Sequence, residues 1–315
     1  MLSAINSAAE RWSAAAPWTN VVGVARTLLA LGTALTLIAS PGTALFTPAA
    51  GVPRFPHCGA TAAVGLFCFV PIELLPLAQV AAVALLLLVA SGWRPRFTAI
   101  PHWWIAFSVA SSITIPDGGD QVTQNLTLLL LPVAITDPRR WHWSQLGPPC
   151  DRRLQTLVAR SALLMIGLQM AVIYAHSSLG KLGVPEWTDG TALYYWSSDP
   201  MFGAPGWLAP ILRLLTSSPA GVAMLTWGPL ALEGALALAL LLPPRARRLL
   251  LPAGIGFHVV IAVMMGLVSF ALAMIAGLIL YLRPADRPFS LAVLRAAVPM
   301  HRSSALRGRL LPAHK

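Results

Sequence analysis

Long apolar runs separated by short polar turns dominate the pattern of this chain. A helix needs about 20 apolar residues to cross the hydrocarbon core of a membrane unaided. The runs approach that length, and Pro, Gly, Ser and Arg residues, which are typical of helix ends at a membrane interface, bound them. The pattern predicts spans at residues 21–38, 74–90, 101–115, 121–135, 157–175 and 222–242, followed by a longer run at 249–282.

The last run is too long for one span. As a single helix its 34 residues would measure roughly 51 Å at 1.5 Å per residue, well beyond the thickness of the hydrocarbon core. Gly266 to Ser269 offer a break near its middle, so we expect two short spans instead. The spans at 101–115 and 121–135 are also short, which predicts that the DGGD turn between them lies in a hydrated recess.

The amino-acid composition indicates whether the chain folds in water or in a lipid bilayer. Hydrophobic residues make up 57% of the 315 residues and charged residues only 10%, where a soluble domain has roughly a quarter charged residues. These values exclude an ordinary soluble domain. The predicted fold class is an all-α polytopic integral membrane protein with about eight transmembrane helices. The three cysteines have no CxxC-like spacing, so no metal site is expected.

The basic residues set the topology. With eight spans and a cytoplasmic N-terminus, seventeen arginines and Lys315 fall on the cytoplasmic side, a strong positive-inside pattern that also places the C-terminus there. The net charge of +11 therefore needs no nucleic acid to explain it. The domains expected are a cytoplasmic segment at 1–20, a transmembrane domain at 21–282 and a basic cytoplasmic tail at 283–315, whose arginines bind the anionic leaflet of the bilayer. Extracytoplasmic loops are expected at 40–73, 116–120 and 176–221.

Polar chemistry is concentrated in residues 174–196, YAHSSLGKLGVPEWTDGTALYYW. Lys181 stands out because twenty of the twenty-two basic residues are arginine and the other lysine is Lys315. A desolvated lysine can lose its proton, whereas a guanidinium effectively cannot. Lys181 is thus either an interfacial anchor for a helix end or a reactive amine. A Ser–Lys pair with Ser177 or Ser178 is a further alternative.

Arg26, Glu233 and His258 fall inside predicted spans, where burying a charge is costly and often functional. Arg26 lies in the first turns of the first span, where it can reach the cytoplasmic interface or form an ion pair with Glu233, the only carboxylate inside another span. His258 is either a functional group at half-depth or a neutral imidazole bonded to a neighbouring helix.

Cys58 and Cys68 lie ten residues apart in the loop expected on the oxidising side. A structural disulfide is the favoured interpretation there. A redox pair that makes a disulfide in a client peptide is the alternative, although catalytic pairs more often have CxxC spacing. Cys150 falls in a cytoplasmic segment and is expected to be a plain thiol.

Several motifs resemble those of one bacterial family. The runs GWRPRF, IPHWW, DGGDQ, LLLLP and RRWHW, with VARTLLALGTALTL before them, look like the sporulation-delaying protein B (SdpB) family. The resemblance implies a multi-pass protein of the bacterial cell membrane that matures a secreted peptide toxin from a larger precursor, together with a small SdpA-like partner protein.

The central stretch is also similar to the wider HTTM group, which includes vitamin K-dependent gamma-carboxylase. The matching residues are Lys181, Leu182, Trp187, Asp189 and Gly190. In the carboxylase the lysine of this motif is taken as the base that deprotonates a reduced quinone. The resemblance therefore implies general-base chemistry at Lys181, His258 placed opposite it, and a membrane quinone as cofactor.

An extracytoplasmic cavity lined by carboxylates and aromatics would suit a translocated cationic peptide. The aromatics could equally form an interface belt. Two classes of function follow: an enzyme-like maturation factor that depends on Lys181, and a non-catalytic scaffold that presents the precursor to a partner or protease. The residues expected to contact the substrate are Asp117, Asp120, Glu186, Trp187, Asp189 and Tyr194.

Overall fold

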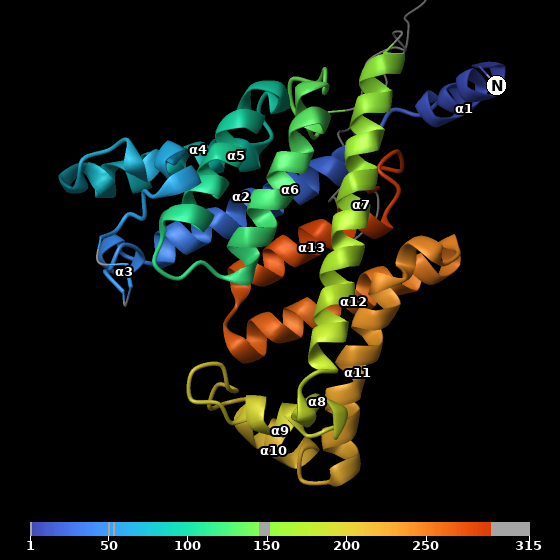
Figure 1. The fold of residues 1–315 in the computed structure, drawn as a ribbon. Helices are drawn as coiled ribbons and strands as arrows, with labels where there is room; N and C mark the ends of the chain where they lie inside the picture. The colour runs from blue at the N-terminus through green and yellow to red at the C-terminus, as the bar shows by residue number, and fades with distance from the viewer. Residues whose placement is uncertain (1, 50, 53, 145–151, 291–315) are drawn as a thin grey trace, which may run out of the picture.

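The protein is helical, as Figure 1 shows for the computed structural model. The structure describes residues 2–49, 51–52, 54–144 and 152–290, in which helices alternate with loops and two isolated β-bridges. The tail beyond residue 290 and Cys150, with the expectations made for them, lie outside this part. Helix α1 (Leu2–Ser13) occupies the predicted N-terminal segment and packs against α7.

Four helices form the N-terminal half of the fold, and each matches a predicted span. These are α2 (Asn20–Ala39), α4 (Leu75–Ser91), α5 (Pro95–Ser112) and α6 (Gly118–Ile135). Thr19 caps α2 by accepting a hydrogen bond from the backbone N–H of Val21, and Gly92 ends α4 with a φ of +87°. Such caps satisfy backbone groups that a helix end leaves unpaired.

Four further helices form the other half. Helix α7 (Arg153–Lys181) is followed by α11 (Pro219–Ala237), α12 (Pro244–Met265) and α13 (Val268–Leu282). The predicted break in the 249–282 run is confirmed, because Gly266 ends α12 with a φ of +73°, a conformation that glycine adopts without strain.

Five of these elements are long and apolar enough to cross a membrane by length and composition, namely α2, residues 72–91, α7, α11 and α12. Helices α5 and α6 have 18 residues each but are less apolar, and α13 has only 15. The membrane class is therefore supported. The count of eight spans and the side of each terminus stay predictions.

The most buried helix is α13, which lies between the two halves (Figure 1). It packs against α2, α12, α6 and α7, and its small residues Ala273, Ala276 and Gly277 allow close approach. This explains how a 15-residue apolar helix is stable: its neighbours, rather than lipid, satisfy most of its surface. A second core joins α2, α4 and α5 with the loop that follows α3 (Gly42–Leu45).

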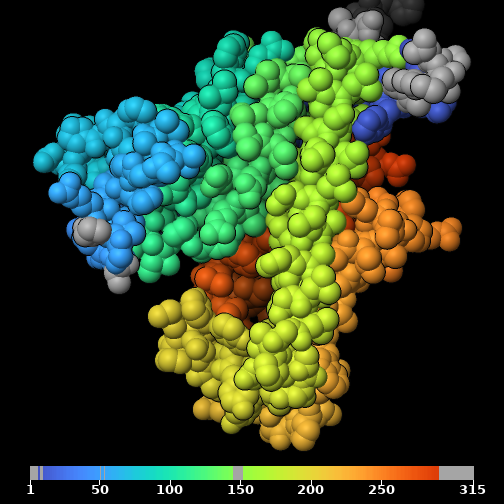
Figure 2. Space-filling view, viewed as in Figure 1, coloured from blue at the N-terminus to red at the C-terminus, as the bar shows by residue number. Residues whose placement is uncertain are grey.

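The predicted loop at 176–221 needs correction. Its first six residues continue α7 to Lys181, and α11 already begins at Pro219. Between them, residues 182–218 form a lobe with three short helices, α8 (Pro185–Thr188), α9 (Ala192–Ser197) and α10 (Ala209–Leu215). This lobe protrudes beside the end of α7, as the yellow segment of Figure 2 shows.

Candidate functional site

A cavity of about 660 Å³ lies where the lobe meets the helices. Residues of α6, α7, α11, α12 and α13 line it together with α8 and α9 of the lobe. Figure 2 shows a recess at this place, between the yellow lobe and the helices next to it. Gly118, Gln121 and Asn125 border the cavity from the start of α6, where the sequence predicted a hydrated recess.

The polar centre of the cavity is an ion pair between Lys181 and Glu233. The lysine Nζ donates to the Glu233 Oε2 at 2.5 Å and to the Ser177 Oγ at 2.8 Å. The Ser177 hydroxyl in turn donates to the Glu233 Oε1 at 3.2 Å. The serine lies four residues before the lysine, so one face of α7 carries both toward α11. Glu233 is only 5% exposed, which makes this a mostly buried pair.

Trp187 covers the lysine from the lobe. The Lys181 Nζ lies 5.2 Å from the centre of the Trp187 ring, within the range of a cation–π contact. The lobe is held against α11 at this point, because the Trp227 indole donates to the Trp187 carbonyl oxygen at 3.1 Å. Gly190, with a φ of +84°, lets the chain turn tightly against the same Trp227 ring.

His258 lines the same cavity from α12. Its Nε2 lies 2.9 Å from the hydroxyl oxygen of Tyr174 on α7, and the residue is 2% exposed. Its Nδ1 has no hydrogen-bond partner among the described residues. The structure thus brings Lys181, Trp187 and His258 to one cavity, although the lysine and the histidine bond to different partners.

Asp117 and Asp120 do not line the cavity and form the cap of α6 instead. Each side chain accepts from the backbone N–H of the other in a capping box, at 2.8 and 3.1 Å. Asp117 also accepts a hydrogen bond from Ser269 at 2.9 Å, which ties the start of α13 to the start of α6. The signal for this role was local, since the carboxylates flank a helix start three residues apart.

The remaining predicted contact residues lie on the lobe surface, outside the cavity lining. Glu186, Asp189 and Tyr194 are exposed. Asp189 accepts hydrogen bonds from the backbone and the hydroxyl of Thr191, which stabilises the turn before α9. Tyr195 and Trp196 of the same helix are also exposed. Trp196 additionally lines the cavity.

Neither interpretation of Arg26 agrees with the structure. The side chain is 1% exposed, so it does not reach a solvent interface, and its Nη2 donates to the Thr98 hydroxyl at 3.2 Å. The carboxylate proposed as its partner, Glu233, pairs with Lys181 instead. The physical reason is geometry: α11 contacts α7 along its length, while Arg26 on α2 faces α5.

Cys58 and Cys68 form a disulfide in the loop between α3 and α4, with a Cα–Cα distance of 5.7 Å. Neither cysteine lines the cavity beside the lobe. In the part of the chain that the structure describes, no group of three or more His, Cys, Asp or Glu side chains could hold a metal ion.

The cavity fits the head of a membrane quinone by the chemistry of its lining. Phe257, Phe270 and Met274 supply apolar walls, and Lys181 supplies a charged donor. The buried Nδ1 of His258, which lacks a partner among the described residues, is the orphaned polar atom that a quinone oxygen could satisfy.

Sequence comparison relates the chain to known proteins. The chain is 38% identical over 297 residues to the protein YitO of Bacillus subtilis, covering 94% of this chain and 95% of the relative. It is also 33% identical over 276 residues to the sporulation-delaying protein SdpB of the same organism, covering 86% of this chain and 83% of the relative. The chain belongs to the SdpB family. The resemblance inferred from the tryptophan- and arginine-bearing motifs is thereby confirmed.

No family model and no solved structure matches the chain. The match to SdpB spans most of both proteins. The link to the HTTM group and the gamma-carboxylase stays a prediction that rests on residues 181–190.

Proposed function

We propose that the protein is a membrane-embedded maturation factor for a secreted peptide toxin, and that it acts on the translocated precursor at the cavity beside the lobe. The name of the SdpB relative ties that protein to sporulation delay. The observation that carries the proposal is the Lys181–Glu233–Ser177 cluster, which gives a largely apolar cavity a hydrogen-bonded ion pair in its lining. An SdpA-like protein encoded nearby would be its partner.

The ion pair supplies a route for a proton. Lys181 donates to Glu233, so a proton that passes from the ammonium to this carboxylate leaves a neutral amine beside the cavity. That amine can accept a proton from a bound substrate, which is general-base catalysis. Ser177 bonds to both partners and fixes their positions. Before the proton moves, the cation–π contact with Trp187 holds the charged Lys181 side chain beside the cavity.

A quinone cofactor would occupy the apolar part of the cavity. Phe257 and Phe270 would hold its ring, while His258 would hydrogen-bond one of its oxygens. A reduced quinone supplies an acidic hydroxyl and reducing equivalents when bound. In this arrangement Tyr174 keeps the histidine oriented through the Nε2 contact.

The test is a comparison of Lys181 variants at matched membrane levels, with the secreted peptide followed by mass spectrometry. Lys181→Arg keeps the positive charge opposite Glu233 but cannot serve as a base, and Lys181→Met removes both properties. We expect each to lower the amount of mature peptide by about a hundredfold or more, with unprocessed precursor accumulating. If Lys181→Arg made mature peptide at the wild-type level, the role of Lys181 as a general base would be refuted.

A folding control is needed because Lys181→Met leaves a buried carboxylate without its partner, which costs about 3–5 kcal/mol. The double variant Lys181→Met/Glu233→Leu removes both charges and should recover much of that stability. We expect the double variant to insert normally and still make no mature peptide.

The second candidate is a non-catalytic scaffold that presents the precursor to a partner or protease. It is favoured by the lobe surface, where Tyr194, Tyr195, Met201 and Trp207 are all more than half exposed. If this is the function, the double variant processes the precursor normally, whereas Tyr194→Ala/Tyr195→Ala does not.

A further inference from the structure

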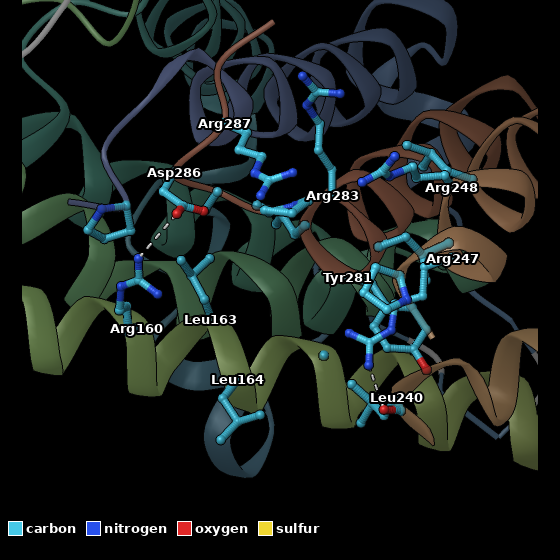
Figure 3. A pocket seen from close by; sticks show the side chains of 18 of the residues that line it. Arg160, Leu163, Leu164, Leu240, Arg247, Arg248, Tyr281, Arg283, Asp286 and Arg287 are labelled. Atoms are coloured by element: carbon cyan, nitrogen blue, oxygen red, sulfur yellow. Dashed lines mark hydrogen bonds and ion pairs between the residues drawn. The ribbon is translucent and has the colours of Figure 1, made fainter. Parts of the chain in front are cut away.

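A second cavity lies along the N-terminal half of α7, away from the lobe. Its volume is about 740 Å³, and it lies between α7, the start of α12, the end of α13 and the segment that follows α13 (Figure 3). Five arginines line it with a single carboxylate, Asp286. The arginines are Arg160, Arg247, Arg248, Arg283 and Arg287.

The positive charge of this cavity is largely uncompensated. Asp286 lies 3.7 Å from Arg160, so one of the five arginines has an acidic partner in the lining. Arg247 donates to the carbonyl oxygens of Leu240 and Leu242, and Arg283 donates to that of Pro288. Bonds to neutral carbonyl oxygens orient the guanidinium groups without neutralising them. The cavity is therefore built to favour an anion.

Two of the arginines are free to bind an anion. Arg248 and Arg287 are exposed, and among the described residues neither side chain has a hydrogen-bond or ion-pair partner. Figure 3 shows both at the rim, on either side of Arg283. The first turn of α12, which begins at Pro244, adds the positive end of a helix dipole to the same place.

The walls of the cavity are apolar. Leu163 and Leu164 of α7, Leu251 of α12 and Leu280 of α13 are among the lining residues. The apolar surface continues outside the cavity, since Leu168 on α7 and Leu249 on α12 are exposed. A ligand that matches both parts has an anionic head and hydrocarbon chains.

We propose that this cavity binds an anionic phospholipid of the cytoplasmic leaflet, with the lipid phosphate between Arg248 and Arg287 and its acyl chains along α7 and α12. The arginines belong to segments that the positive-inside pattern places on the cytoplasmic side, where anionic lipids are found. Residues 291–315 do not compete by charge, because they contain five basic and no acidic side chains.

The experiment uses the full-length protein in detergent and measures lipid binding by native mass spectrometry. The probes are dioleoyl phosphatidylglycerol, dioleoyl phosphatidylcholine and inorganic phosphate. We expect phosphatidylglycerol to bind at least tenfold more tightly than phosphatidylcholine. The variant Arg248→Gln/Arg287→Gln should weaken phosphatidylglycerol binding by about 30-fold.

The matched control is Arg140→Gln/Arg245→Gln. It removes two exposed arginines from the same predicted side of the membrane that do not line the cavity. The control should bind phosphatidylglycerol as the wild type does. Equal loss in both double variants would mean that general surface charge attracts the lipid, and would overturn the site.

Inorganic phosphate distinguishes the lipid from a soluble phosphate compound. If millimolar phosphate displaces phosphatidylglycerol completely, the cavity recognises phosphate alone and the lipid assignment is wrong. The expected result is weak competition, because the apolar walls contribute to lipid binding. The melting temperatures of both double variants should stay near that of the wild type, since the exchanged side chains are exposed and have no hydrogen-bond or ion-pair partner among the described residues.

Discussion

Single residues decide how closely the helices pack around the site. Gly119, in the first turn of α6, shows this most directly. A Cβ at this position would lie 2.5 Å from the Cα and 2.8 Å from the backbone nitrogen of Phe270 in α13. Backbone atoms cannot move aside as the end of a flexible side chain can. At the neighbouring Gly118 the nearest atom would be a ring carbon of Phe270 at 3.4 Å, an ordinary contact.

The first prediction concerns this close approach. Gly119→Ala should push α13 away from α6 and destabilise the protein by about 1–3 kcal/mol, as overpacking does elsewhere. Gly118→Ala is the matched control and should be nearly neutral. Thermal unfolding in detergent measures both. Equal melting temperatures for the two variants would show that this contact does not limit stability.

Lys181 is the residue that sequence reasoning singled out and the structure brought to the cavity. Its rarity in an arginine-rich chain was visible in the sequence, and so was Glu233 as a carboxylate inside a span. The pairing of Lys181 with Glu233 was not visible in the sequence, because 52 residues separate the two and Arg26 was an alternative cationic partner for Glu233. Tyr174 was also missed as a partner of His258, since nothing local distinguishes a tyrosine that faces another helix.

Helix ends decide which polar groups are available for chemistry. Asp117 was expected to attract a cationic substrate, but in the structure it caps α6 and accepts a hydrogen bond from Ser269 at the start of α13. An N-cap needs a side-chain oxygen and not a negative charge, and Asn serves as well as Asp. The two roles of Asp117 can therefore be separated by substitution.

The second prediction uses this difference. Asp117→Asn should keep both stability and toxin maturation, whereas Asp117→Ala should destabilise the protein by about 1 kcal/mol through loss of the cap. Thermal unfolding and mass spectrometry of the secreted peptide measure the two effects. If Asp117→Asn folds normally but yields no mature peptide, the carboxylate charge contacts the substrate, as the sequence had suggested.

At the scale of the whole molecule, the two cavities lie along different halves of α7 and differ in their lining. The one beside the lobe contains a paired lysine, aromatic residues and two histidines, and the other contains five arginines with one carboxylate. A helix of 29 residues measures roughly 43 Å at 1.5 Å per residue, which is long enough to cross the hydrocarbon core of a bilayer. The side of the membrane that each cavity faces stays a prediction.

The third prediction tests this polarity. In a background in which Cys150 is replaced by Ser, Arg213→Cys on α10 of the lobe should react with a membrane-impermeant maleimide on intact cells. Arg245→Cys at the start of α12 should react only after the cells are permeabilised. Both side chains are accessible in the structure, so a difference in labelling reports the side of the membrane. The reverse pattern would contradict the eight-span topology.

The sequence by itself determined the membrane class, the helix positions and the break at Gly266, because these depend on local hydrophobicity and on residues that end helices. It also indicated the family through its tryptophan- and arginine-bearing motifs. The tertiary structure decided which ionisable groups meet. The pairing of Lys181 with Glu233, the capping role of Asp117 and the arginine cavity between α7, α12 and α13 all depend on helices distant in sequence packing side by side, and no local pattern specifies that arrangement.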